Sequence, residues 1–285
     1  MPETPPRPQQ PDQLGPRKPR PLVTMEVLRR EQISEHMVRI IAGGPGFDRF
    51  SPSTCADAYC KIWFGPDGAP IDGSEDLESI RARSERVHWP VSRTYTIRNV
   101  DTEARELAID FVVHGDEGLA GPWAARALPG EPLTFSGPGG AFTPNPDADW
   151  YLLAGDESAL PAIATVLRAL PEDAVGQAFV EVAGPEDRQD LGNPAGVELT
   201  WLYRGNTPAG RSGLLAEALG SVAWQDGAVQ VFAHGEREAM KSLRDILFSH
   251  RGLERSQVSL SGYWAAGRTE DVFQAEKRTP AGKIL

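Results

Sequence analysis

The stretch Arg93-Thr94-Tyr95-Thr96-Ile97-Arg98 contains β-branched and aromatic residues and no Gly or Pro, which is typical of a β-strand. Because side chains alternate along a strand, Arg93 and Tyr95 share one face. Thr96 and Arg98 lie on the opposite face. The guanidinium fork of an arginine suits a diphosphate, and a neighbouring tyrosine ring offers a flat surface to a stacked ring system. The stretch therefore predicts a strand that binds a flavin dinucleotide, and a half-exposed strand with a surface arginine is the alternative.

Length and composition indicate an ordinary globular protein with two domains. A chain of 285 residues can bury two cores, and 40% hydrophobic with 24% charged residues is within the usual range. The net charge of -11 argues against general nucleic-acid binding, which needs a basic surface. Cys55 and Cys60 are the only cysteines and have no partner Cys or His motif, so we expect no metal site and no disulfide framework.

The N-terminal region predicts neither export nor membrane insertion. No apolar run approaches the ~20 residues of a membrane span, and no hydrophobic core of a signal peptide is present. We therefore expect a cytoplasmic protein without membrane attachment, and a monomer. Residues 1–21 are dominated by Pro, Gln, Arg and Lys without apolar periodicity, which predicts a disordered, Pro-rich leader.

Residues 22–146 consist of short strand-like segments separated by turn clusters, and this spacing predicts an antiparallel β-barrel. Between its last two strands, Gly115 belongs to a flexible turn, and Pro122 is well placed in the first turn of a short helix that ends at Pro129. The N-terminus of such a helix presents free amides and positive partial charge to a phosphate.

Residues 147–268 alternate between strand-like and helix-like segments, which predicts a parallel, Rossmann-like sheet. A ligand of such a sheet lies at the carboxyl ends of the strands, where residues 155–158 and 234–236 fall. The expected fold class is thus β + α/β, with an antiparallel β-barrel domain followed by a parallel-sheet domain. Residues 269–285 are expected to form a C-terminal tail.

The Arg-x-Tyr-Thr-x-Arg pattern at 93–98 resembles the flavin signature of the siderophore-interacting protein family. These proteins are FAD-dependent ferric-siderophore reductases, a branch of the ferredoxin-reductase-like flavoproteins. The similarity continues in the family's order through Asp-Phe-Val-Val-His-Gly at 110–115, Gly-Pro-Gly-Gly-Ala-Phe at 137–142, Leu-Leu-Ala-Gly-Asp-Glu-Ser-Ala-Leu-Pro at 152–161 and Ser-Gly-Tyr-Trp at 261–264. Together these blocks cover roughly residues 22 to 268.

The resemblance implies FAD in the barrel and NADPH or NADH in the parallel-sheet domain. It places Thr96 near flavin N5, and the flavin rather than a side chain carries the chemistry. The residues that it implies for FAD are Arg93, Tyr95, Thr96, Arg98, His114, Gly115, Gly121 and Trp123. The residues considered for the nicotinamide cofactor are Gly155, Asp156, Glu157, Ser158, Gly235 and Glu236, although direct phosphate contact by Asp156 or Glu157 is doubtful because both are acidic.

The resemblance also implies a ferric siderophore or another ferric chelate as the substrate, held by a few basic side chains. Lys61, on the strand beside the Arg93 strand, is the candidate for one contact, with a solvated lysine as the alternative. Family members commonly have basic residues where this chain has Gly139 and Ala265, and Arg268 is a candidate replacement. Their loss favours chelates of low net charge. His234 stands where the family more often has Ala.

Two adjoining cofactor sites indicate a relay in which NAD(P)H reduces the flavin and the flavin reduces chelated Fe(III) to Fe(II). Ferrous iron is the softer ion and leaves the oxygen donors of a chelate more easily. The alternatives are a reductase with a ferredoxin-like protein acceptor, a siderophore-binding module without turnover, and a flavin store or sensor. Arg188 and Arg204 are both candidates for a 2′-phosphate contact, so the sequence leaves NADH and NADPH open.

Overall fold

The first domain is a closed six-stranded β-barrel. The computed structural model describes residues 21–116 and 118–285, so residues 1–20 of the predicted leader lie outside the described residues. Around the barrel the strands follow the order β1-β2-β5-β4-β3-β6, and every adjacent pair is antiparallel. The strands are β1 (Leu22–Ser34), β2 (Met37–Gly43), β3 (Tyr59–Phe64), β4 (Val91–Asp101), β5 (Glu106–Val112) and β6 (Pro132–Gly139).

Alternating apolar side chains from every strand fill the barrel. Ile40, Ile62, Ile109 and Phe135 are fully buried in this core. Burying such side chains is the main favourable term in folding, and the alternation leaves the second face of each strand for other contacts. Two short helices lie outside the strands: α1 (Leu77–Arg83) follows β3, and α2 (Ala120–Arg126) follows β5.

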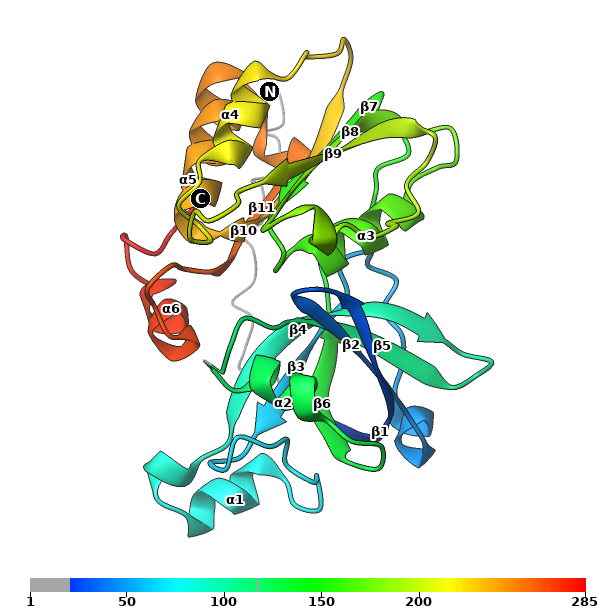
Figure 1. Ribbon diagram of the computed structural model, residues 1–285, viewed down its shortest axis with the longest axis vertical. Coiled ribbons are helices and arrows are strands. Elements are labelled where there is room, and N and C mark those ends of the chain that lie inside the picture. The colour runs from blue at the N-terminus through cyan, green and yellow to red at the C-terminus, as the bar shows by residue number, and fades with distance from the viewer. Residues whose placement is uncertain (1–20, 117) are drawn as a thin grey trace, which may run out of the picture.

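The second domain is a five-stranded parallel sheet with the order β11-β10-β7-β8-β9. The fold class predicted from the sequence is therefore confirmed. Helix α3 lies on the sheet face toward the barrel, and α4 and α5 cover the other face (Figure 1). The elements are β7 (Trp150–Gly155), α3 (Leu160–Ala169), β8 (Val175–Val182), β9 (Gly196–Tyr203), α4 (Leu214–Ser221), β10 (Val229–Glu236), α5 (Arg237–Arg244), a π-helical stretch (Asp245–His250), β11 (Val258–Trp264) and α6 (Glu270–Glu276).

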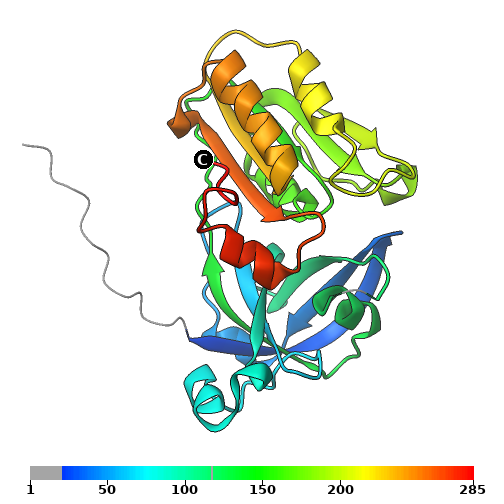
Figure 2. The same ribbon diagram turned by 90° about the vertical axis from the view of Figure 1, so that its left-hand side faces the viewer.

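Two segments fix the junction of the domains. At one, the hairpin between β1 and β2 reaches the second domain, where buried Asp187 accepts hydrogen bonds from Ser34 Oγ, from the His36 amide and from His36 Nδ1 at 2.8–3.1 Å. At the other, α6 lies between the sheet and the barrel (Figure 2). Phe273 of α6 is 1% exposed, so the segment expected to be a tail is packed against the rest of the molecule.

No helix among the described residues is long and apolar enough to cross a membrane.

Candidate functional site

Strand β4 has a free edge where the Arg-x-Tyr-Thr pattern begins. Its pairing with β3 runs from Val91 to Thr96, whereas its pairing with β5 covers only the part from Ile97 to Asp101. Along residues 91–96, the edge away from β3 therefore has no strand partner among the described residues. Backbone groups at such an edge are available to a ligand.

Arg93 and Tyr95 lie on this half of the strand. The Tyr95 ring lies 4.4 Å from the ring of Phe111, centre to centre, which fixes the tyrosine on the wall of the barrel. Among the described residues, the Arg93 guanidinium makes a 2.9 Å hydrogen bond to the Ser92 carbonyl and a long 3.5 Å contact with Asp271, and no other polar contact. Since neither contact is a bidentate carboxylate pair, the fork of Arg93 retains donors for an anionic ligand.

The helix expected to cap a diphosphate is present as α2, but its tryptophan points inward. Trp123 packs edge-on against Phe64 and Phe111 in the barrel core, and its indole donates to Glu131. A Cβ on Gly121 would lie 2.9 Å from the Val112 carbonyl oxygen, so this glycine lets α2 pack closely on β5. Both residues position the helix, and neither side chain is free to contact a ligand.

The loop before α2 is exposed. His114 is solvent-exposed, and Gly115 has a φ of 69°, a left-handed conformation that favours glycine. The two residues follow β5 on the side of the barrel where β4 and β5 have separated. Their position agrees with a loop that contacts a ligand, and the His114 side chain is exposed to solvent.

Arg98, the last residue of the pattern, is separated from the other three. A register shift lies between Ile97 and Asn99, and the Arg98 side chain is 4% exposed beside buried Asp110, at 3.6 Å. It lines a pocket that also involves Thr165 of α3. The structure thus does not bring Arg98 to the free edge of β4, and it is left out of the flavin site proposed below.

A polar chain joins the two domains at Thr96. His234 Nδ1 lies 2.9 Å from the Tyr263 hydroxyl, and His234 Nε2 lies 2.9 Å from Ser259 Oγ. Burial raises the pKa of Tyr263, and a hydrogen bond with Thr96 opposes that shift. Burial also lowers the pKa of His234 to about 3, so the imidazole is neutral at physiological pH. The hydrogen bonds therefore run from Ser259 of β11 through His234 of β10 back to Tyr263 of β11, which lies beside Thr96 of the flavin strand.

Asp156 ties together the carboxyl ends of three strands. One of its oxygens accepts hydrogen bonds from the amide and hydroxyl of Ser158, and the other accepts from the Glu236 amide at 2.7 Å and from Trp264 Nε1 at 2.9 Å. Asp156 is 5% exposed. Its carboxylate is fully used by the protein, so it positions the edge of the sheet.

Two glycines keep this edge compact. A Cβ on Gly155 would lie 2.4 Å from the His234 carbonyl oxygen. Gly235 has a φ of 154°, and a Cβ there would lie 2.8 Å from Asp156. The glycines allow neighbouring backbones to approach, whether or not a cofactor binds beside them.

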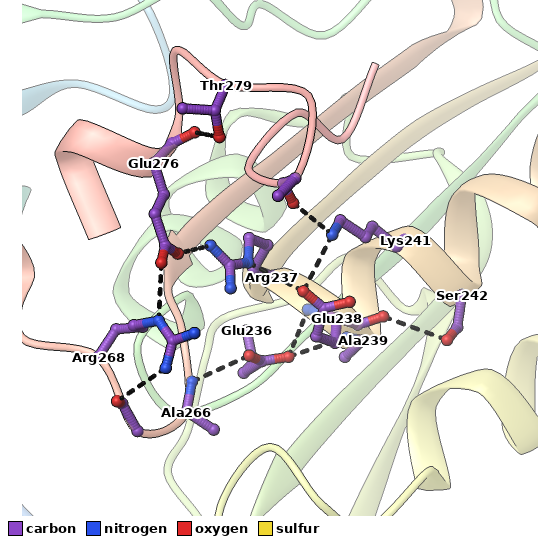
Figure 3. Close-up of polar contacts among 12 residues, drawn as sticks. Glu236, Arg237, Glu238, Ala239, Lys241, Ser242, Ala266, Arg268, Glu276 and Thr279 are labelled. Atoms are coloured by element: carbon purple, nitrogen blue, oxygen red, sulfur yellow. Dashed lines mark hydrogen bonds and ion pairs between the residues drawn. The ribbon is translucent and has the colours of Figure 1, made fainter. Parts of the chain in front are cut away.

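Glu236 is also committed to internal contacts. One of its oxygens accepts from the Glu238 and Ala239 amides, where it caps α5, and the other accepts from the Ala266 amide (Figure 3). It is 1% exposed. The side chain that the sequence suggested for the cofactor instead fixes α5 and the loop after β11.

Glu157 lies beside Arg204 at the same edge. The two side chains form an ion pair, and burial raises the pKa of Glu157 to about 7. Arg204 is thereby neutralised, whereas Arg188 is exposed and has no ion pair among the described residues. Of the two arginines considered for a 2′-phosphate, Arg188 retains its donors.

Of the two candidate substrate residues, Arg268 is engaged in an ion pair within the protein and Lys61 is exposed. Arg268 donates to Glu276 at 2.8 Å, and Glu276 also pairs with Arg237, so Arg268 helps to fasten α6 (Figure 3). Lys61 is exposed on β3. Burial lowers the pKa of Lys277, and the charge of Lys61 lowers it further, which places the two ammonium groups within electrostatic reach.

Sequence reasoning missed Lys277, Asp271 and Tyr263. The first two lie in the segment expected to be a tail, where the sequence holds one usable indication: Thr269 followed by two acidic residues marks a helix start, and its side chain caps α6. Nothing local to Tyr263 indicates a bond to Thr96, because the two residues are 167 positions apart.

The chain matches two family models. Residues 26–142 match the siderophore-interacting FAD-binding domain, and residues 148–267 match the siderophore-interacting protein model. These ranges correspond to the barrel and to the parallel-sheet domain, which together have the ferredoxin-reductase-like fold.

Individual proteins agree with the models. The chain is 46% identical to Rv2895c of Mycobacterium tuberculosis, covering 91% of this chain and 95% of that one. It is 32% identical to the ferric vibriobactin reductase ViuB of Vibrio cholerae, covering 89% and 93%. A siderophore utilization protein from T. fusca superposes with a TM-score of 0.76 at 38% identity, covering 88% of this chain and 96% of the other. The chain belongs to the siderophore-interacting protein family.

Proposed function

We propose that this protein is an FAD-dependent NAD(P)H:ferric-siderophore reductase, which passes electrons from NAD(P)H through FAD to chelated Fe(III) and releases Fe(II). The observation that carries the proposal is the free edge of β4 with Arg93, Tyr95 and Thr96, which lies beside Tyr263 of the parallel-sheet domain. A relay needs this adjacency, because the electron donor NAD(P)H and the acceptor Fe(III) must both reach the same flavin ring system.

The residues present at the free edge fit FAD. Arg93 has donors for a diphosphate, the Tyr95 ring offers a stacking surface, and the backbone of residues 93–96 offers hydrogen-bonding groups without a strand partner. Bound FAD supplies two-electron acceptance from the nicotinamide and one-electron donation to iron. The protein binds and orients it, and neutral His234 holds the Tyr263 hydroxyl in place.

The nicotinamide cofactor is proposed to lie along the strand ends of β7 and β10. Asp156 and Glu236 hold this edge rigid through their internal hydrogen bonds, which is the role of a supporting shell. Arg188 is the residue that we assign to a 2′-phosphate, since Arg204 is engaged by Glu157. The proposed cofactor is therefore NADPH in preference to NADH.

Lys61 and Lys277 are proposed to receive the ferric chelate. A protein of net charge -11 repels an anion at long range, so capture requires local positive charge in partly buried surroundings. With Gly139 and Ala265 uncharged, this pair is the available basic group beside the flavin strand. Chelates of low net charge are expected to be reduced faster than a tris-catecholate.

The experiment is anaerobic mixing of the FAD-loaded protein with NADPH or NADH, followed by absorbance of the flavin. We expect NADPH to bleach the flavin band, and Arg188→Met to reduce the ratio of NADPH to NADH rates at least fivefold. Arg255→Met, which changes an exposed arginine elsewhere in the same domain, is the control. If neither nicotinamide bleaches the band over many minutes, the relay is wrong.

A second arm separates the possible acceptors. The reduced protein is mixed with a hydroxamate ferric chelate, a tris-catecholate ferric chelate or an oxidised ferredoxin. Rapid oxidation by ferredoxin, with no reaction of either chelate, would assign the reductase to a protein acceptor. Rapid reaction of the hydroxamate chelate is the expected result.

A further inference from the structure

A pocket of about 180 Å³ lies between the barrel and α3, on the side of β4 away from the free edge. It is lined by Phe50, Ser53, Cys55, Arg98, Asn99 and Thr165, among other residues. These side chains come from the loop before β3, from the second half of β4 and from α3. Nothing in the proposed relay uses this pocket.

Arg98 is the unusual residue of the pocket. Its side chain is 4% exposed, and neither Nε nor Nη1 has a hydrogen-bond partner in the part of the chain that the structure describes. A buried guanidinium nitrogen without an acceptor is costly, because its desolvation is not compensated. Native proteins rarely leave such groups unsatisfied, so each one requires an explanation.

Asp110 forms a long ion pair with Arg98 but does not accept a hydrogen bond from it. Both of its oxygens already accept from Arg39, at 2.6 and 2.8 Å, in a bidentate pair. The Arg98 Nε lies 3.6 Å from the same carboxylate, beyond a good hydrogen bond. Two guanidinium groups thus share one carboxylate inside the molecule.

A third arginine adds to the positive charge. Arg168 on α3 is exposed, and its pKa is lowered by partial desolvation and by the charge of Arg39. Asp190 opposes the shift of Arg168. Among the described residues no acidic side chain lines the pocket itself, whereas Ser53 and Asn99 bring a hydroxyl and an amide group to it. The Thr165 hydroxyl also faces the pocket, but it already donates to the Ala162 carbonyl at 2.8 Å.

We propose that this pocket binds a small oxyanion, held by Arg98 and by the neighbouring hydroxyl and amide donors. At about 180 Å³ the pocket has room for a phosphate or a small carboxylate. An anion here bridges the barrel and α3 and compensates the buried charge of Arg98. The proposal does not rest on the relay.

The test is isothermal titration of the FAD-loaded protein with inorganic phosphate in a chloride buffer of constant ionic strength, with acetate titrated in parallel. Bound FAD keeps phosphate away from the proposed diphosphate site. We expect saturable 1:1 binding to the wild type, and at least tenfold weaker binding to Arg98→Met. Tighter binding of phosphate than of acetate identifies the phosphate class, and the reverse order identifies a carboxylate.

Thr165→Glu provides a second variant that does not remove the arginine. Its carboxylate can reach the pocket from α3 and replace the anion, so we expect phosphate binding to be abolished and the melting temperature without phosphate to rise. Thr165→Gln has nearly the same size without the charge and should block phosphate without that rise. Arg105→Met, at an exposed barrel arginine paired with Asp48, should bind phosphate like the wild type.

The proposal is overturned if neither anion binds the wild-type protein saturably. It is also overturned if phosphate binds Arg98→Met or Thr165→Glu with the affinity of the wild type. Should Arg98→Met fail to fold, the Thr165→Glu titration decides the question alone.

Discussion

Two edges meet at the domain junction, and they use their polar side chains in opposite ways. On the barrel, Arg93 keeps most of its donors and residues 91–96 of β4 have no partner on one side. On the parallel sheet, Asp156 and Glu236 are saturated with hydrogen bonds from neighbouring strand ends and loops. Both sets stand where the sequence predicts ligand contacts. The hydrogen bonds already made within the protein distinguish a residue that meets a ligand from one that holds the site together.

Asp156→Asn tests whether the saturated carboxylates of the parallel sheet hold the strand ends together, and we expect it to have the largest effect of the variants proposed here. The amide group would turn a donor toward hydrogen-bond donors of Ser158, Glu236 or Trp264, at a cost of about 2–4 kcal/mol in the free energy of unfolding. Urea unfolding measures it, with exposed Asp147→Asn as the control. Unchanged stability together with weaker nicotinamide binding would show that Asp156 contacts the cofactor and does not hold the strand ends together.

Arg93→Ala tests whether the barrel edge, where side chains keep free donors, binds a ligand. Removing a charge-assisted contact to a diphosphate should weaken FAD binding at least tenfold while leaving the fold intact, since Arg93 makes few internal contacts. Flavin fluorescence titration gives the Kd. Arg83→Ala, at an exposed arginine paired with Glu75, is the matched control. If the Arg93→Ala protein retained FAD with wild-type affinity, the FAD diphosphate would not bind at this edge of β4.

His234→Gln tests the polar chain between the edges through its pH dependence. The folded-state pKa of His234 is about 3, below its ordinary 6.5, so neutral His234 contributes stability above pH 6.5 that is lost as the pH falls toward 3. The stability difference between wild type and His234→Gln should shrink from pH 7.5 to pH 5.

Urea unfolding at several pH values measures that difference. Glu157 has the opposite slope, because its raised pKa of about 7 makes stability fall as the pH rises from 4.5 to 7. This effect is common to both proteins and cancels in the difference. His250→Gln, at an exposed histidine, serves as the control. A difference that is constant with pH would show that His234 does not titrate on unfolding.

Glu276→Gln should have the smallest effect and concerns α6. Its carboxylate joins Arg237 and Arg268, so the variant loosens the helix that carries Lys277 (Figure 3). We expect roughly a two- to fivefold rise in KM for an anionic ferric chelate, as for other partly exposed ion pairs, with the rate of flavin reduction unchanged. Steady-state kinetics measure both, and Glu217→Gln on α4 is the control. A fall in the flavin-reduction rate would connect α6 to the nicotinamide step instead.

The fold was predictable because its determinants are local. Alternating apolar residues predict the barrel strands, and alternating strand and helix segments from Trp150 onward predict the parallel sheet. The packing of α6 was missed because its burial depends on one residue, Phe273, and on contacts with distant parts of the chain.

The site was predictable only in part, for a physical reason. Sequence spacing places Asp156 and Glu236 at strand ends. It does not predict their hydrogen-bond donors, because Trp264 lies 108 positions after Asp156 and Ala266 lies 30 positions after Glu236. The separation of Arg98 from Arg93 follows from the register shift near residue 98, which alternation along an ideal strand does not predict.

The most direct measurement is the yield of ferrous iron from a single turnover. The FAD-loaded protein is reduced with NADPH under anaerobic conditions, freed of excess nicotinamide, and mixed with a hydroxamate ferric chelate and a ferrous-specific chromophore. A two-electron-reduced flavin and a one-electron acceptor predict two Fe(II) formed per flavin as the flavin absorbance returns. Return of the flavin absorbance without Fe(II), or a flavin that stays reduced beside the chelate, would contradict the proposed reductase.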